Sequence, residues 1–348
     1  MAASVFISGA TETAVVDSLD SLRAMEREWR ELWRRDRSAT PFHSPDWLIP
    51  WTRYLWGGGK LQVVTLRPDG RLAAIAPFFV WRYGRGELRL SLLGCGISDY
   101  LGMISVPGFA GEAAGAVARW MTQPEVEWSS CDLQELRPGD PLLAAAQRFT
   151  GLKPRQCSLC PVLALRGSLE EQLAGTPAKF RRSIRTAEKR LHEAGDVEFV
   201  RAGADDVDWL IDALFDLHTA RWQECGESGM FATPSLRKFH REVAHRFART
   251  DMLRLYGLLV NGECVAVQYN FAANRRVYAY LAGFDPAWSR SSPGAVLLAH
   301  SIEDAIAEGN REFDFLRQAE EFKHSWGAVD QRTEQLLIRA QVGSRIAS

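Results

Sequence analysis

The stretch Ser292-Pro-Gly-Ala-Val-Leu-Leu298 combines a tight glycine turn with the start of a helix. It is followed by Phe313-Asp-Phe-Leu316, whose alternation is typical of a short strand carrying one acid, and then by Glu321-Phe-Lys-His-Ser-Trp326. The N-terminus of a helix leaves backbone N–H groups unpaired, and the helix dipole is positive there. The turn at 292–295 therefore predicts a site for an anion.

Outward from this stretch, the chain repeats one order of elements. Three strand patterns, at 61–67, 71–81 and 87–93, precede Gly94, and three more, at 253–260, 263–273 and 276–281, precede Gly283. Hairpin turns, Asp69-Gly70 and Asn261-Gly262, stand at equivalent places. The turn glycines lie 192 residues apart and the terminal glycines 189 residues apart. This near-constant offset predicts two copies of one unit.

Helical periodicity surrounds both groups of strands. It covers 19–35 before the first group, 180–191 and 205–217 before the second, and 294–308 after it, where Gly309 ends the pattern. The segment 151–167 contains two prolines and two cysteines with little period. We therefore predict an α+β tandem with mixed, mainly antiparallel sheets, its first domain at 1–160 and its second at 161–348.

The composition is that of an ordinary globular protein of 348 residues with a net charge of −1. This charge favours no nucleic-acid partner, and the N-terminus lacks the basic start and apolar core of a signal peptide. No apolar run reaches the ~18 residues of a membrane helix, so we expect a cytoplasmic protein. The six cysteines are scattered, and Cys157 and Cys160 form a lone pair without a zinc-site partner, so we expect reduced thiols and no metal.

The order of elements resembles the acyl-CoA N-acetyltransferase (GNAT) fold. More specifically, the chain resembles the tandem branch that includes CelD-type cellulose-biosynthesis acetyltransferases and Fem-type aminoacyl transferases of peptidoglycan synthesis. This resemblance implies two tandem GNAT-like domains, the first of them degenerate and the second carrying the active site. The matching stretches are Pro41–Trp47, Leu93–Tyr100, Lys179–Arg185, His218–Trp222, Phe284–Pro286, Ser292–Gly294 and Phe313–Trp326.

Two departures from the family pattern concern the second half. Members usually carry a glycine after the Phe-Asp-Phe-Leu strand, where this chain has Arg317-Gln318. The glycine-rich pyrophosphate loop of ordinary GNAT enzymes is shortened to Ser291-Ser-Pro-Gly-Ala295. The resemblance implies acetyl-CoA or another acyl-CoA as co-substrate, with the pyrophosphate at Ser292, Pro293, Gly294 and Ala295. Two amides on one face of a strand, Gln268 and Asn270, are candidates for binding the acyl carbonyl or the pantetheine amides.

N-acyl transfer needs an amine freed of its proton and an acid for the departing thiolate. Asp314 is the candidate that orients or deprotonates the amine, and the alternative is a strand acid satisfied by an arginine. Tyr280 is the candidate acid, because a phenol with a pKa near ~10 suits a thiol leaving group; the alternative is a core aromatic. Lys323 is a candidate for holding a phosphate or the substrate, and Trp326 for walling the pocket; a solvated lysine lying on Trp326 is the alternative.

Other polar residues are candidates for the acceptor site. His218, Arg221 and Trp222 share one helix face, and a helix docked at a domain seam is the alternative. Asn270 shares a strand face with Gln268, and a face that is only partly solvated is the alternative. By resemblance, Asp99 of the first half faces a cleft between the halves; a loop-capping aspartate is the alternative. The helix at 179–190 has a basic face that suits a phosphate of coenzyme A, an anionic sugar precursor or the acceptor end of a tRNA, or that is only solvated.

These observations predict an N-acyltransferase, with acetyl as the first candidate, acting on a small-molecule or sugar amine of a polysaccharide or cell-envelope precursor. A Fem-like transferase that uses aminoacyl-tRNA is one alternative, and it alone would bring in a nucleic-acid partner. A non-catalytic binding protein of the same fold is the other. The acceptor, the acyl length and the oligomeric state stay open at this point.

Overall fold

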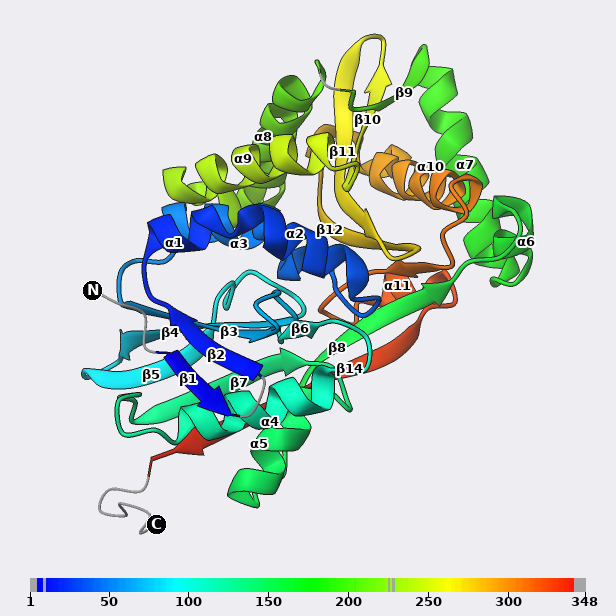
Figure 1. Cartoon of the computed structure of the whole chain (residues 1–348). Coiled ribbons are helices and arrows are strands. Elements are labelled where there is room, and N and C mark those ends of the chain that lie inside the picture. The colour runs from blue at the N-terminus through cyan, green and yellow to red at the C-terminus, as the bar shows by residue number, and fades with distance from the viewer. Residues whose placement is uncertain (1–4, 9–10, 204, 225, 227–228, 341–348) are drawn as a thin grey trace. The chain divides into compact units, whose positions relative to one another are not determined.

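The structure is a computed structural model, and it describes residues 5–8, 11–203, 205–224, 226 and 229–340. The chain divides into two compact units (Figure 1). The first comprises Met1–Ser158 together with Arg332–Ser348, and the second comprises Leu159–Gln331. The architecture is of mixed α+β type, as the sequence predicts, and the strands within each unit pair predominantly antiparallel.

The described part of the first unit contains strands, helices and one 3₁₀ turn. These elements are β1 (Val5–Ser8), β2 (Thr11–Val16), α1 (Leu19–Ala24), α2 (Glu26–Arg35), η1 (Pro41–His43), α3 (Pro45–Tyr54), β3 (Lys60–Pro68), β4 (Ala74–Tyr83), β5 (Glu87–Leu92), β6 (Ile104–Ser105), α4 (Ala110–Met121), β7 (Ser130–Leu136), α5 (Pro141–Thr150) and the end of β14 (Val329–Arg339). The strand order is β1-β2-β3-β4-β5-β7-β14, and only β5 and β7 pair in parallel.

Alternation along the strands of the first unit gives its sheet two covered faces. On β4, Phe78 and Val80 join the core that includes residues of α4 and α5. Phe79 points to the other face, where its ring lies 5.3 Å from that of Trp51 on α3. Figure 1 shows α4 and α5 on one side of this sheet and α1, α2 and α3 on the other. The unit is thus a three-layer α/β/α arrangement.

The second unit follows the same plan. Its described elements are the end of β8 (Arg155–Ala164), α6 (Leu169–Ala174), α7 (Ala178–Ala194), β9 (Val197–Arg201), α8 (Val207–Glu224), η2 (Met230–Ala232), α9 (Pro234–Arg249), β10 (Leu253–Val260), β11 (Glu263–Ala273), β12 (Arg276–Phe284), η3 (Pro286–Ser291), α10 (Pro293–Ala307), β13 (Glu312–Asp314), α11 (Glu321–Ser325) and the start of β14. The strand order is β9-β10-β11-β12-β13-β8, and only β12 and β13 pair in parallel.

Helices cover both faces of the second sheet as well. The apolar stripe of α7, which includes Ile184 and Leu191, packs with α10 against one face. On the other face, Phe247 of α9 meets Phe271 of β11 edge to face, with their centroids 4.9 Å apart. Helix α8 lies close to β12 at Gly283, where a Cβ would lie 2.6 Å from the backbone nitrogen of His218. Only glycine permits this separation.

Three features differ from the sequence interpretation. The predicted helix at 19–35 is two helices, because Met25 leaves helical geometry between α1 and α2. The boundary segment 151–167 is largely the strand β8, which begins in the first unit and ends in the second. Residues 334–339 of β14 pair with β7 in the first unit, although the sequence assigns 161–348 to a single second domain. Strand partners distant in sequence leave no local signal.

We expect Gly283→Ala to lower the free energy of unfolding by about 1–3 kcal/mol, because the added methyl group meets the backbone of α8. Gly294→Ala is a matched control in the same unit, since its Cβ would lie at an ordinary 3.7 Å from the Phe284 ring. The control should be neutral or stabilising by up to about 1 kcal/mol. Urea unfolding measures both variants, and equal stabilities would contradict the close approach.

Candidate functional site

Strand β12 carries a bulge beside β11. Tyr269 lies opposite Leu281 and Asn270 lies opposite Ala279, so Tyr280 is the extra residue between these two pairs. A bulge interrupts the ladder of backbone hydrogen bonds and bends its strand, and bulges are over-represented next to active sites. The irregularity therefore marks this part of β12 as a candidate site.

The two parallel strands of the second unit, β12 and β13, diverge next to this bulge. β12 pairs with β13 only from Arg276 to Tyr278, opposite Glu312 to Asp314. β13 then ends, whereas β12 continues to Phe284. The bulge at Tyr280 thus lies in the section of β12 that has left its parallel neighbour. An opening between the carboxyl ends of adjacent parallel strands is a common place for a ligand.

The N-terminus of α10 lies at the end of β12. Ser292, in the left-handed conformation at φ 47°, precedes Pro293, and its side chain makes no capping hydrogen bond. The N–H of Ala295 donates to the Ser292 carbonyl at 3.0 Å, while the N–H of Gly294 has no acceptor among the described residues. The predicted anion site at 292–295 is therefore a helix start with a free N–H group, and the dipole of a 15-residue helix adds to it.

Gln268 and Asn270 lie together on the face of β11 that α10 covers. The Gln268 Oε1 atom accepts a hydrogen bond from Ser301 of α10 at 2.8 Å and another from Asn270 at 3.2 Å. Both amides are buried. These contacts tie α10 to the sheet, and the predicted contacts of the two amides with a carrier and an acceptor stay predictions.

Tyr280 faces the opposite side of the sheet, towards α9. Its ring stacks on Phe271 at 5.2 Å and lies 5.6 Å from His240, with Tyr269 at 6.2 Å. Burial raises the pKa of the Tyr269 phenol well above its usual value and lowers the pKa of His240 to about 3. Tyr280 is half-buried at the edge of this aromatic cluster, next to the parting of the strands. Its role as an acid stays a prediction.

His218, Arg221 and Trp222 line the C-terminal part of α8. The Nε2 atom of His218 accepts a hydrogen bond from the Trp222 indole at 2.9 Å. The neutral ring therefore carries its proton on Nδ1, which is buried and has no hydrogen-bond partner in the described chain. Burial, helped by the charge of Arg221, lowers the pKa of His218 to about 4. His218 is thus a neutral hydrogen-bond donor at pH 7.

Arg221 points elsewhere, towards the end of β12. Its guanidinium lies 5.4 Å from the centre of the Phe284 ring, and the side chain is exposed. Gly294 also approaches Phe284. The structure therefore brings Arg221 and the start of α10 to the same aromatic ring, a neighbourhood that the sequence alone did not predict.

Asp314 is fully buried at the end of β13. One carboxylate oxygen accepts the N–H of Leu316 at 2.9 Å, and the other accepts from Arg276 at 3.2 Å. Arg276 also pairs with Glu312, and these neighbours raise its pKa further above its usual value, although burial alone would lower it. The contacts match the alternative of a strand acid satisfied by an arginine, and the role of Asp314 with an amine stays a prediction.

Lys323 holds the segment after β13. Its ammonium group donates to the carbonyl oxygens of Phe315, Arg317 and Gln318 at 2.8–3.0 Å, and Glu320 lies 3.2 Å away. Leu316 and Gln318 both have positive φ, at 58° and 75°. The lysine thus stabilises the turn that contains Arg317 and Gln318. Binding of a phosphate by Lys323 stays a prediction, and its three donor positions already have acceptors.

Two further candidates lie away from this turn. Trp326 is buried in the core of the second unit, where its ring meets Phe180 edge to face at 5.1 Å. Asp99 belongs to the first unit and is buried beside Tyr100. A contact of either residue with an acceptor stays a prediction.

Sequence reasoning missed Arg276, Ser301 and His240. Arg276 meets Asp314 because Tyr278 and Asp314 pair in parallel register, and Ser301 meets Gln268 because α10 folds back on β11. His240 comes from α9 and reaches Tyr280 across the layer. For Arg276, a signal was available in the sequence, because strand alternation places it on one face with Tyr278 and Tyr280. Ser301 and His240 had no such signal.

No group of three His, Cys, Asp or Glu side chains in the described chain is arranged to hold a metal. Within the same residues, no helix has the length and apolar character needed to cross a bilayer. The cysteines at 95, 131, 157, 160 and 264 form no disulfide.

A sequence model described as "Acetyltransferase (GNAT) domain" matches residues 178–324. The match extends from α7 to α11 and contains the bulge, the parted strands and the start of α10. This part of the chain is therefore similar to GNAT domains. No curated protein sequence matches it.

Solved structures extend the likeness to most of the chain. FemX has a TM-score of 0.64 at 10% identity, covering 89% of this chain and 95% of its own. L-PGS from Bacillus licheniformis has a TM-score of 0.58 at 10% identity, covering 90% and 91%. A conserved protein of unknown function from Bacteroides thetaiotaomicron has a TM-score of 0.56 at 13% identity, covering 93% and 98%. The chain therefore shares its fold with these proteins over most of its length.

We expect Lys323→Met to lower the free energy of unfolding by about 2 kcal/mol, because three carbonyl groups lose a charged donor. Lys179→Met is the matched control, since Lys179 is exposed on α7 with no partner among the described residues. The control should change stability by less than about 0.5 kcal/mol. Urea unfolding measures the stability of both variants. An unchanged stability of Lys323→Met would contradict the stabilising role of the three Lys323 hydrogen bonds.

We also expect His218 to make stability depend on pH. Its folded pKa of about 4 lies below the ordinary 6.5, so protonation favours the unfolded state and stability falls as the pH drops from about 6.5 towards 4. The destabilisation caused by His218→Gln should shrink across this window by up to about 1.4 kcal/mol per pH unit. Urea unfolding at pH 7 and pH 5 measures it.

The exposed His192 of α7 provides the control for this titration. Comparing His218→Gln and His192→Gln with the wild type removes the contributions of groups common to all three proteins. A His218→Gln difference that is the same at both pH values would show that the imidazole is not held neutral.

Proposed function

We propose that this protein transfers an acyl group from acyl-CoA to a primary amine, with acetyl as the first candidate. The observation that carries the proposal is the bulged end of β12, which has parted from β13 and adjoins the start of α10. A strand edge without a partner offers backbone groups to the amides of a pantetheine arm. The two features lie next to each other, as the two ends of one carrier require.

The start of α10 suits the pyrophosphate of the carrier. The free N–H of Gly294 and the helix dipole supply a positive site, and Arg221 lies on the neighbouring Phe284 ring. A charge-assisted hydrogen bond from an arginine to a phosphate is about twice as strong as a neutral one. Arg221 would therefore contact the carrier, in addition to the acceptor contact that the sequence predicts for it.

The chemistry would proceed by direct attack of the amine on the thioester. Burial raises the pKa of the Cys264 thiol to about 11, and burial likewise raises the pKa of Cys95 and Cys157, so none of these thiols is a ready nucleophile. Asp314 would accept the proton that the attacking nitrogen loses, and Tyr280, at the bulge, would protonate the departing thiolate. Asp314 and Lys323 would shape the turn after β13 around the amine, because their polar atoms already hold that turn.

The acceptor we propose is an amino sugar of a polysaccharide or cell-envelope precursor. This choice rests on the resemblance to CelD-type acetyltransferases. The buried Nδ1–H of His218 and the neighbouring Trp222 would supply a hydrogen bond and an apolar surface for a sugar ring.

A second candidate is a Fem-like transfer from aminoacyl-tRNA. The TM-score of 0.64 with FemX over most of both chains favours it. The basic face of α7 also favours it, because Lys179, Arg182 and Arg185 are exposed and form no ion pair among the described residues.

Calorimetric titration of acetyl-CoA and of free coenzyme A into the purified protein tests the first candidate. We expect dissociation constants of about 1–100 μM, a binding free energy of roughly −8 to −5 kcal/mol. Gly294→Trp should abolish binding by filling the start of α10, whereas Gly294→Ala should retain it, since its Cβ makes only an ordinary contact. Failure of both ligands to bind would overturn the acyl-CoA proposal, and binding of aminoacyl-tRNA to the same protein would replace it with the Fem-like one.

A further inference from the structure

A hollow of about 410 Å³ lies in the second unit between α6, α7 and α10. Its lining consists of Leu169, Glu170, Leu173, Ala174, Arg181, Arg185 and Glu303. The volume is within the range of small-molecule sites, which begins at about 300 Å³. Glu303 is near the C-terminal end of α10, nine residues or about 14 Å from Gly294, so the hollow is separate from the proposed acyl-CoA site.

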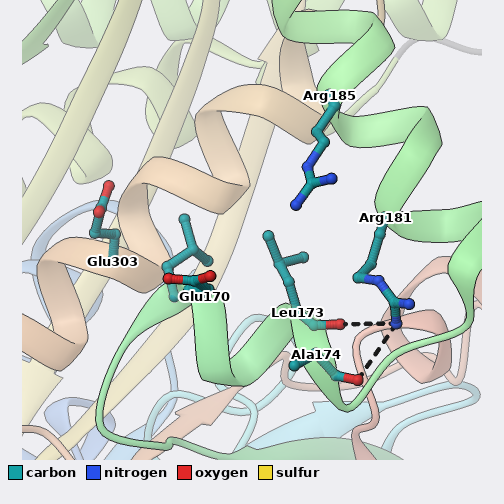
Figure 2. A pocket seen from close by; sticks show the side chains of 7 residues that line it. Glu170, Leu173, Ala174, Arg181, Arg185 and Glu303 are labelled. Atoms are coloured by element: carbon teal, nitrogen blue, oxygen red, sulfur yellow. Dashed lines mark hydrogen bonds between the residues drawn. The ribbon is translucent and has the colours of Figure 1, made fainter.

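The charges of the hollow are divided between two sides. Figure 2 shows Arg181 and Arg185 on one side, Glu170 and Glu303 on the other, and Leu173 between them. A ligand carrying only negative charge would meet the two carboxylates, and one carrying only positive charge would meet the two guanidinium groups. A ligand with one charge of each sign avoids both conflicts.

Three of these four charged side chains are available to a ligand. Within the described chain, Arg185, Glu170 and Glu303 form no hydrogen bond or ion pair, and Figure 2 shows the Arg185 guanidinium directed into the hollow. Arg181 differs, because its Nη1 atom donates to the carbonyl oxygens of Leu173 and Ala174 at 3.4 and 3.3 Å and to that of Thr176. Arg181 thus fixes the end of α6 and leaves Arg185 as the free cation.

The arrangement of the charges and the apolar surface of the hollow restrict the class of ligand further. An α-amino acid carries both charges on one carbon atom, whereas the hollow places its opposite charges on opposite sides. A dipeptide carries them at its two ends, up to about 7 Å apart when extended. Leu169 and Leu173 would contact an aliphatic side chain in the middle.

We propose that this hollow binds a free dipeptide with aliphatic side chains. Arg185 binds its carboxylate, Glu303 and Glu170 bind its ammonium group, and the two leucines contact its side chains. The inference is independent of the proposed acyl-CoA transfer, because it uses none of the residues near β12 or at the start of α10; it shares Arg185 with the Fem-like candidate alone.

Calorimetric titration of L-alanyl-L-leucine into the full chain tests this inference. We expect saturable binding, weakened at least about tenfold by Arg185→Gln and also by Glu303→Gln, since each variant loses one charge-assisted contact. Arg182→Gln is the matched control, because it removes an unpaired cation of α7 that does not line the hollow. It should leave the affinity unchanged.

Two dipeptide derivatives, each with one terminal charge removed, distinguish a site that binds both charges from a site that binds only an anion or only a cation. N-acetyl-L-alanyl-L-leucine lacks the ammonium group and L-alanyl-L-leucinamide lacks the carboxylate, so both should bind at least about tenfold more weakly than the free dipeptide. Equal binding of the acetylated peptide would reveal an anion site only, and equal binding of the amide a cation site only. Either result, or no binding of the dipeptide, overturns the proposal. Acetyl-CoA binding to Arg185→Gln reports separately on the acyl-carrier site.

Discussion

The three residues of β13 must satisfy backbone hydrogen bonds on both edges, and the rest of the second unit depends on this constraint. One edge pairs in parallel with β12 and the other antiparallel with β8. Because β13 ends at Asp314 while β12 continues, the strands part and leave the bulged section of β12 without a parallel neighbour. The same plan recurs in the first unit, where β7 pairs in parallel with β5 and antiparallel with β14. Each unit thus completes its sheet with a strand distant in sequence.

Tertiary contacts replace a glycine in the turn after β13. Leu316 and Gln318 adopt positive φ, a conformation that costs most residues of order 1–3 kcal/mol. Asp314 accepts the N–H of Leu316, and the Lys323 ammonium gathers three carbonyl oxygens of the same turn. Lys323 and Asp314 therefore act on backbone groups here, and these contacts stabilise the turn after the Phe-Asp-Phe-Leu strand.

Ionisable side chains near the bulge of β12 are paired or neutral, whereas polar groups at the start of α10 and at the hollow are unpaired. Asp314 pairs with Arg276, and burial keeps His218 and His240 neutral at pH 7. By contrast, the start of α10 retains an unpaired N–H group, and Arg185 and Glu303 are unpaired at the hollow by the other end of this helix. The proposed phosphorylated carrier suits the start of α10, and the proposed zwitterion suits the hollow, because each ligand carries charges opposite to those left unpaired there.

The sequence by itself determined the local elements of the chain and the repeat of the three-strand group. Alternation and Asn-Gly or Asp-Gly turns specify β3 to β5 and β10 to β12, and the apolar stripes specify α7, α8 and α10. Only the tertiary structure decided the pairing of β8 with β13 and of β14 with β7, since these partners are far apart in sequence. It also decided the pairing of Asp314 with Arg276 and the hydrogen bonds of Lys323 to the turn after β13. These contacts depend on register and layer packing between segments far apart in sequence, and neither periodicity nor turn chemistry encodes them locally.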